Sequence, residues 1–136
     1  LSVMARVRFA GQKEHWKSIC SAYRSSPYLE FYEADLAPFF NEKIISLYEF
    51  NLTLIEKIMF LLELPFSFES VLFDKENDLR EDRLVLAKKI PPIIQEKYTQ
   101  VFEDKAGFLS NLSVLDALFN LGPNCAYYVK NANLPA

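Results

Sequence analysis

Between residues 41 and 64, polar side chains recur at spacings of three and four in a segment that is otherwise apolar. This spacing matches the 3.6 residues of one helical turn, so it predicts a long amphipathic helix with a wide apolar face. Pro65 follows directly and is expected to stop the helix. We expect this helix to lie at the centre of the fold. Its polar positions are Glu42, Ser46, Glu49, Thr53, Glu56 and Glu63.

Asn51 projects almost opposite the centre of this polar face, among apolar side chains. The pattern therefore predicts that Asn51 is buried. A buried amide without hydrogen-bond partners costs on the order of 1 to 3 kcal/mol. Two roles are open for it: a clamp that holds a neighbouring backbone segment, or a substrate-binding residue that lines a polar cavity.

The remaining segments have shorter patterns. Residues 14–24 place their apolar side chains on one helical face and predict a further helix. Alternation in residues 1–10, and apolar side chains in residues 66–73 and 98–102, indicate short strands. The expected fold is therefore mainly α, or α+β with minor strands: a compact helical domain around a central long helix, with short flanking strands.

The segment from residue 107 to residue 123 has clear helix boundaries, because it ends on a Gly-Pro pair and contains a Ser-x-x-Asp sequence. In this capping-box variant, Ser113 caps the helix and the carboxylate of Asp116 reaches back to the N-cap backbone. Together with Asn111, these residues also place three polar groups at one helix N-terminus, where backbone N–H groups attract anions such as phosphate. A capping role and an anion-binding role are both open for Asp116.

Charge and cysteine usage exclude several classes of protein. The net charge is -3 and the sequence pI is about 5.2, whereas nonspecific nucleic-acid binding requires clustered Lys and Arg. Two cysteines are too few for a disulfide framework, which favours a cytoplasmic location. The apolar stretch 44–62 is interrupted by charged residues and is too polar to span a membrane.

His15 is the only histidine, so a histidine-rich metal site is excluded within this chain. The sequence contains no GxSxG, P-loop or GxGxxG motif, so it leaves the cofactor unknown and predicts no metal-binding residues. His15 lies beside the apolar face of the predicted helix at residues 14–24. It could act as a general base or be a hydrogen-bonded packing residue.

Three separated blocks carry a wider pattern: residues 14–28, residues 98–102 and residues 111–122. In this order they resemble the pattern of the WbqC-like protein family, and specifically its C-terminal portion. The family's early aromatic- and proline-rich block is not in this chain. We therefore expect residues 1–136 to be a single WbqC-like domain that lacks the N-terminal region of the family.

The resemblance implies an association with bacterial O-antigen or other surface-polysaccharide biosynthesis, and a nucleotide sugar or other small-molecule ligand. It names neither a reaction nor an oligomeric state. The alternative is a noncatalytic binding or assembly protein. An enzyme should bring His15 and the segment 111–116 to one aromatic-lined cleft. The candidates are His15 and Asp116 as catalytic residues, and Asn111, Ser113, Asn120, Tyr23 and Asn51 as substrate-binding residues.

Overall fold

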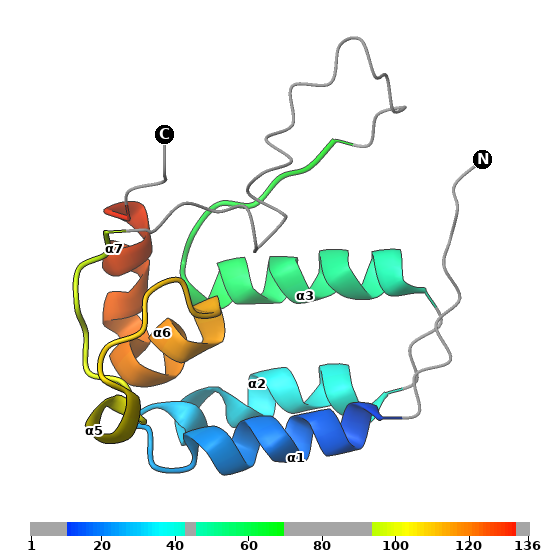
Figure 1. The fold of residues 1–136 in the computed structure, drawn as a ribbon. Coiled ribbons are helices and arrows are strands. Elements are labelled where there is room, and N and C mark those ends of the chain that lie inside the picture. Colours follow the sequence, from blue (N-terminus) through cyan, green and yellow to red (C-terminus); the bar gives the residue numbers. More distant parts are fainter. Residues whose placement is uncertain (1–10, 43–45, 70–93, 133–136) are drawn as a thin grey trace, which may run out of the picture.

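The structure is a computed structural model that describes residues 11–42, 46–69 and 94–132 (Figure 1). All regular secondary structure in these ranges is helical, which confirms the mainly α prediction. The elements are α1 (Gln12–Tyr23), α2 (Leu29–Asn41), α3 (Leu47–Leu61), α5 (Glu103–Ala106), α6 (Val114–Leu121), the 3₁₀ helix η2 (Gly122–Asn124) and α7 (Cys125–Lys130). None of the described helices is long and apolar enough to cross a bilayer.

The three longest helices lie side by side, and the shorter C-terminal helices pack against one end of them (Figure 1). α1 and α2 are antiparallel, and α3 runs along α2. An ion pair of 2.8 Å between Lys57 Nζ and Asp35 Oδ1 joins α3 to α2. α6, η2 and α7 lie at the end where α1 stops, α2 starts and α3 stops.

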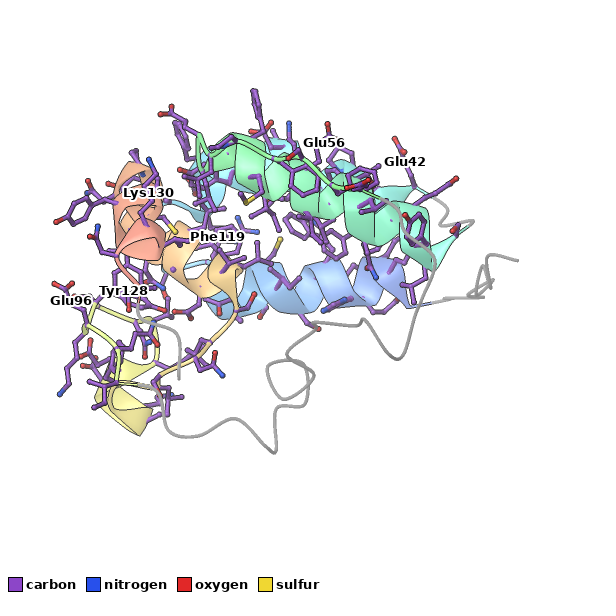
Figure 2. All side chains as sticks on the ribbon, turned by 90° about the horizontal axis from the view of Figure 1, so that it is seen from above. Glu42, Glu56, Glu96, Phe119, Tyr128 and Lys130 are labelled. Atoms are coloured by element: carbon purple, nitrogen blue, oxygen red, sulfur yellow. The ribbon has the colours of Figure 1, made fainter. Side chains whose placement is uncertain are left out.

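The core forms where α2 meets α6 and α7. The buried residues of α2 recur at spacings of three and four, so they form one stripe along the helix. The backbone N–H of Tyr28 donates to the carbonyl of Phe119 at 3.0 Å and fixes the start of α2 against α6. Phe119 lies within α6 and is fully buried (Figure 2). The largest fully buried side chains are Phe119, Leu29, Leu36, Leu118 and Cys125.

The helix predicted at residues 14–24 is present as α1, which begins two residues earlier. Trp16 and Cys20, four residues apart, are its buried side chains. The Trp16 ring stacks on the ring of Phe40 in α2, with 5.0 Å between the centroids and 20° between the planes. This stacking holds α1 against the C-terminal half of α2.

α3 corrects the prediction of a central helix from residue 41 to residue 64. It begins only at Leu47, after the N-cap Ser46, and none of its residues is buried. Its apolar side chains are spread around more of the helix than α2 covers. Tyr48, Ile55 and Phe60 consequently remain 49%, 46% and 71% exposed. The core lies between α2, α6 and α7 instead.

The predicted burial of Asn51 is also wrong, because its side chain is exposed. The residues of α3 that pack inward include Leu54, Ile58 and Leu61. At 100° per residue, Asn51 projects roughly 50° away from the centre of the face formed by these three residues. The polar face of the sequence therefore identified α3 as a helix but did not identify the direction of its partner. Asn51 is therefore not a buried clamp, and it lines neither of the two pockets described below.

The predicted flanking strands are absent from the described residues. The segment 98–102 is irregular and ends in a turn. Gln100 supplies the hydrogen bonds that a neighbouring strand would give: its Nε2 donates to the Leu109 carbonyl at 2.8 Å, and its Oε1 accepts from the Leu109 amide at 2.9 Å. Residues 66–69 are irregular as well, and the predicted strand residues 1–10 and 70–73 lie outside the described residues.

Candidate functional site

A cleft of about 450 Å³ lies between α1 and α3. Phe40 contributes to it from α2, and the start of α6 contributes at the end where Tyr23 lies. Most of its lining is aromatic or aliphatic, with a small number of polar side chains among them. The lining residues are Gln12, His15, Ile19, Tyr23, Phe40, Leu47, Phe50, Leu54, Ser113 and Leu115. Small-molecule sites commonly have this combination of concave apolar surface and few polar groups.

His15 lies at the edge of the cleft with an exposed side chain. Its neighbour Trp16 occupies the buried direction of α1, and His15 is rotated from it by about 100° around the helix. The imidazole meets the Phe40 ring edge-on, with 5.6 Å between the centroids and 89° between the planes. His15 is therefore oriented by an aromatic contact and remains accessible to a ligand in the cleft.

Ser113 is the N-cap of α6, as the sequence predicts. Its Oγ accepts a hydrogen bond from the amide of Leu115 at 3.2 Å, and its carbonyl accepts from the amide of Asp116 at 2.9 Å. The same residue lines the cleft. Asn111 does not line it: this residue has a left-handed backbone with φ of 59°, and its amide donates to Oε1 of Gln95 at 2.8 Å.

Asp116 departs from the predicted capping-box role. Its side chain is 4% exposed and faces the interior instead of the N-cap backbone. The hydroxyl of Tyr23 donates to Oδ2 at 2.8 Å, and the hydroxyl of Tyr98 donates to Oδ1 at 2.5 Å. Hydrogen bonds to a carboxylate are stronger than those between neutral groups, so two phenol donors can hold this side chain in the interior.

Burial and the neighbouring Asp116 carboxylate both affect the pKa of Tyr23 and that of Tyr98. Burial, followed by the hydrogen bond to Asp116, raises the pKa of Tyr23 and that of Tyr98 above the ordinary tyrosine value. Both hydroxyls therefore remain protonated donors at neutral pH. Because the ring of Tyr23 also lines the cleft, this residue connects the buried carboxylate to the ligand-accessible surface.

Asn120 lies one helical turn after Asp116 and supports it from within α6. Its Nδ2 donates to the Asp116 carbonyl at 2.8 Å and approaches Oδ1 at 3.5 Å. Asn120 does not line the cleft. The sequence candidates thus divide into three groups: His15, Tyr23 and Ser113 at the cleft, Asp116 and Asn120 behind Tyr23, and Asn51 and Asn111 away from both.

Two residues of the site were not singled out from the sequence. Tyr98 belongs to a block that carries the family resemblance, but its assignment to a strand gave no reason to pair it with Asp116. Gln12 lines the cleft, and its buried Nε2 has no hydrogen-bond partner among the described residues. Its position before the apolar face of α1 gave no signal. Within the described part of the chain, no group of three or more His, Cys, Asp or Glu side chains could hold a metal ion.

Comparison with known proteins identifies a protein family. The model of the WbqC-like protein family matches residues 4–89, which is more than half of the 136-residue chain. The match includes α1, α2 and α3 and lies toward the N-terminus of the chain. The two later blocks of the resemblance, residues 98–102 and 111–122, fall outside it, so assigning the resemblance to the C-terminal portion is not supported. No curated protein and no solved structure matches the chain.

Proposed function

The chain belongs to the WbqC-like protein family, and we propose that it binds an activated sugar in the cleft between α1 and α3, in the cytoplasmic stage of bacterial surface-polysaccharide (O-antigen) synthesis. The observation that carries this proposal is that His15, Tyr23 and Ser113 line one cleft together with Phe40 and Phe50. The cleft volume of about 450 Å³ lies within the range of roughly 300 to 1,000 Å³ common for small-molecule sites.

In this proposal, different parts of an activated sugar contact different walls of the cleft. The rings of Phe40 and Phe50 and the side chain of Leu54 offer contact area to the apolar faces of a sugar ring or an acyl substituent. Ser113 lies at the N-terminal end of α6, where the helix dipole favours a phosphate oxygen. The Asp116 carboxylate is turned inward to the two tyrosines, away from this end.

His15 is the proposed proton-transfer group of the site. Histidine is a common general base in enzymes, and the His15 imidazole is accessible in the cleft. Asp116 has no surface at the cleft, so in this proposal it positions Tyr23 and does not contact the sugar. A sugar hydroxyl in the cleft would contact the edge of the Tyr23 ring. The hydrogen bond from the Tyr23 hydroxyl to Asp116 holds this ring in place.

Isothermal titration of the protein with UDP-, GDP- and dTDP-sugars and with acyl-CoA donors tests the proposal. We expect a nucleotide sugar to bind, and His15→Gln to weaken its binding at least tenfold. Lys17→Gln is the matched control, because Lys17 is exposed on the same helix and does not line the cleft. An affinity that is the same in wild-type protein and in His15→Gln would contradict the role of this cleft.

A noncatalytic binding or assembly protein is the second candidate. Three large aromatic residues support it, because Phe31, Phe60 and Tyr127 are 67%, 71% and 73% exposed. Exposed apolar surface of this kind is a feature of interaction sites. Light scattering coupled to size-exclusion chromatography separates the candidates: assembly predicts an oligomer that dissociates in Phe31→Ser, whereas the cleft proposal predicts no effect of that substitution on sugar binding.

A further inference from the structure

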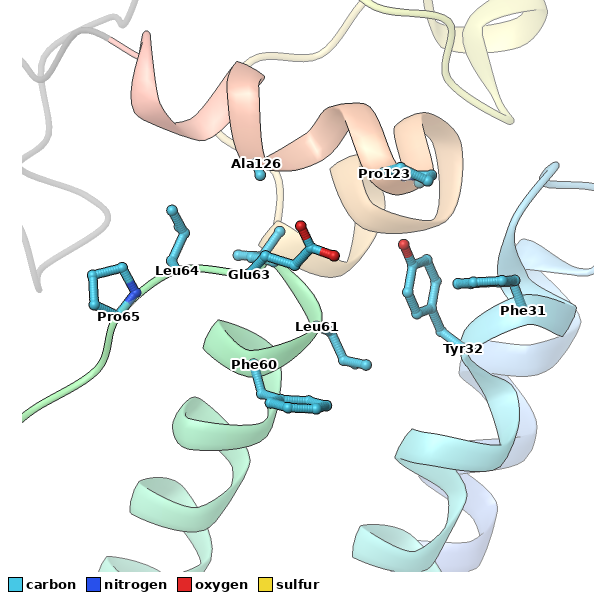
Figure 3. A pocket seen from close by; sticks show the side chains of 11 residues that line it. Phe31, Tyr32, Phe60, Leu61, Glu63, Leu64, Pro65, Pro123 and Ala126 are labelled. Carbon is cyan, nitrogen blue, oxygen red and sulfur yellow. The ribbon is translucent and has the colours of Figure 1, made fainter.

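A second pocket, of about 610 Å³, lies where the end of α3 faces α2 and η2 (Figure 3). It shares no lining residue with the cleft between α1 and α3. Its lining combines aromatic rings, proline rings and one carboxylate: Phe31, Tyr32, Phe60, Leu61, Leu62, Glu63, Leu64, Pro65, Gly122, Pro123 and Ala126. The carboxylate is the only charged side chain among these residues.

Glu63 holds this carboxylate in an uncommon backbone conformation. It follows the C-cap of α3 with a left-handed φ of 55°. The Glu63 amide donates to the Phe60 carbonyl at 3.0 Å and the Leu64 amide donates to the Met59 carbonyl at 2.9 Å. This is the Schellman pattern of helix ends, in which glycine is the usual residue because a Cβ is disfavoured there. A glutamate at this position keeps a strained backbone and places a negative charge at the pocket.

The Glu63 carboxylate, the Tyr32 hydroxyl and two exposed aromatic rings lie around this pocket. In Figure 3 its carboxylate points into the pocket, toward the side from which the Tyr32 hydroxyl also enters. Burial raises the pKa of Tyr32, so this hydroxyl remains a donor. Phe31 and Phe60 are 67% and 71% exposed, and the Phe31 ring is held edge-on against the Tyr32 ring with 4.8 Å between the centroids.

Phe60 already takes part in a cation–π contact. Nζ of Lys57 lies 5.3 Å from the centroid of its ring. The charge of that lysine is compensated by Asp35, whose Oδ1 lies 2.8 Å from the same nitrogen. The Glu63 carboxylate has no ion-pair partner among the described residues, so the lining of the pocket carries an uncompensated negative charge beside aromatic rings.

We propose that this pocket binds a small organic ammonium ion, with the cationic nitrogen between the Glu63 carboxylate and the rings of Phe31 and Phe60. Aromatic faces attract cations through the ring quadrupole, and the attraction increases when the ion is partly removed from water. The carboxylate supplies the charge partner, and the proline and leucine side chains contact the apolar part of the ion. This site is independent of the proposed sugar cleft.

A comparison of choline with its neutral isostere 3,3-dimethylbutan-1-ol measures how much the positive charge of the ligand contributes to binding. In an amide-resolved NMR titration of the whole chain, we expect choline to shift the resonances of Glu63, Leu64 and Ala126. We also expect it to bind at least tenfold more tightly than the isostere. Equal affinity of the two compounds, or shifts confined to the cleft between α1 and α3, would overturn the assignment.

Three variants separate binding from folding. Glu63→Gln keeps the side-chain shape without the charge and is expected to weaken choline binding at least tenfold. Glu56→Gln, which changes an exposed carboxylate within α3, is the control and should leave binding unchanged. Glu63→Gly relieves the left-handed backbone, so it should melt no lower than the wild type while losing choline binding. Retained binding in both Glu63 variants would refute the site.

The source of the ammonium group is tested with phosphatidylcholine vesicles. A pocket for a free cation predicts that the protein stays in the supernatant when the vesicles are sedimented. Sedimentation with the vesicles that is lost in Glu63→Gln would overturn the assignment to a free ion and indicate a lipid headgroup instead.

Discussion

α6 and α3 are built from similarly apolar sequences but have opposite roles in the molecule. α6 has only eight residues, yet Asp116, Ala117, Leu118 and Phe119 are all buried. α3 has fifteen residues and none of them is buried. α6 contacts α2, α7 and Tyr98, whereas α3 contacts α2 through the Lys57–Asp35 ion pair and the Phe50–Phe40 ring pair.

Among the described residues, the shorter helix with more packing partners contributes to the core, whereas the longer helix does not. α3 instead contributes to the walls of the cleft and of the second pocket: Leu47, Phe50 and Leu54 line the cleft, and Phe60 and Leu61 line the second pocket. Substitutions in α6 should therefore change stability. Substitutions in α3 should change ligand binding with little effect on stability.

The largest expected effect comes from truncating one phenylalanine in each helix. Phe119 is fully buried, so Phe119→Ala should lower the free energy of unfolding by about 3 to 5 kcal/mol through lost burial and the resulting cavity. Phe60 is 71% exposed, and Phe60→Ala should cost about 0.5 kcal/mol or less. Urea unfolding measures both. Similar losses in the two variants would remove the distinction between the helices.

Two glycines give a second contrast, because Gly122 ends α6, Gly107 ends α5, and both have a positive φ. In Gly122, with φ of 57°, an added Cβ would lie 2.6 Å from the Tyr28 ring. Gly122→Ala should therefore cost about 2 to 4 kcal/mol, from backbone strain and overpacking together. Gly107 also has a positive φ but no atom within 4 Å, so Gly107→Ala is the control and should cost about 1 kcal/mol. Equal losses in thermal melts would exclude the clash with Tyr28.

Two carboxylates provide the third contrast. Asp116→Asn removes the charge to which the Tyr23 and Tyr98 hydroxyls donate, and it should cost about 1.5 to 3 kcal/mol. Glu56→Gln in α3 changes an exposed carboxylate and should stay within about 0.5 kcal/mol of the wild type. Chemical denaturation at neutral pH compares them. An unchanged free energy of unfolding in Asp116→Asn would show that the two hydroxyls find an equally good acceptor without the charge.

A smaller effect is expected at alkaline pH. The folded state raises the pKa of Tyr23 and that of Tyr98, so it holds their protons more tightly than the unfolded chain does. The resulting stability is fully present below the ordinary tyrosine pKa of about 10 and is lost as the pH rises above it. Melting temperatures measured from pH 8 to pH 11 should fall less steeply in the Tyr23→Phe, Tyr98→Phe double variant. Parallel curves would contradict the linkage.

Local signals in the sequence located several elements of the structure. Ser113 was identified as a helix cap from its place before an apolar run, and a cap depends only on residues within one turn. The helical face containing Trp16 located α1 for the same reason. The mainly helical class followed from such local patterns.

Long-range contacts could not be obtained in this way. Tyr23 and Asp116 are 93 residues apart, and neither has a local pattern that names the other as its partner. The apolar side chains at residues 98–102 indicated a strand, but Gln100 hydrogen-bonds the Leu109 backbone and the Tyr98 hydroxyl donates to Asp116. Asn51 was misplaced because amphipathic patterning gives a polar face, while the position of α2 determines which part of the apolar face is covered.

An amide-resolved NMR titration with the tightest-binding nucleotide sugar tests the central claim most directly, because it locates the ligand on the described helices. The cleft between α1 and α3 predicts concentration-dependent shifts at His15, Tyr23, Leu54 and Ser113, with no change at Phe31 or Ala126. Shifts confined to Phe31, Leu64 and Ala126, or no shifts with any nucleotide sugar, would contradict the assignment of this cleft as the sugar site.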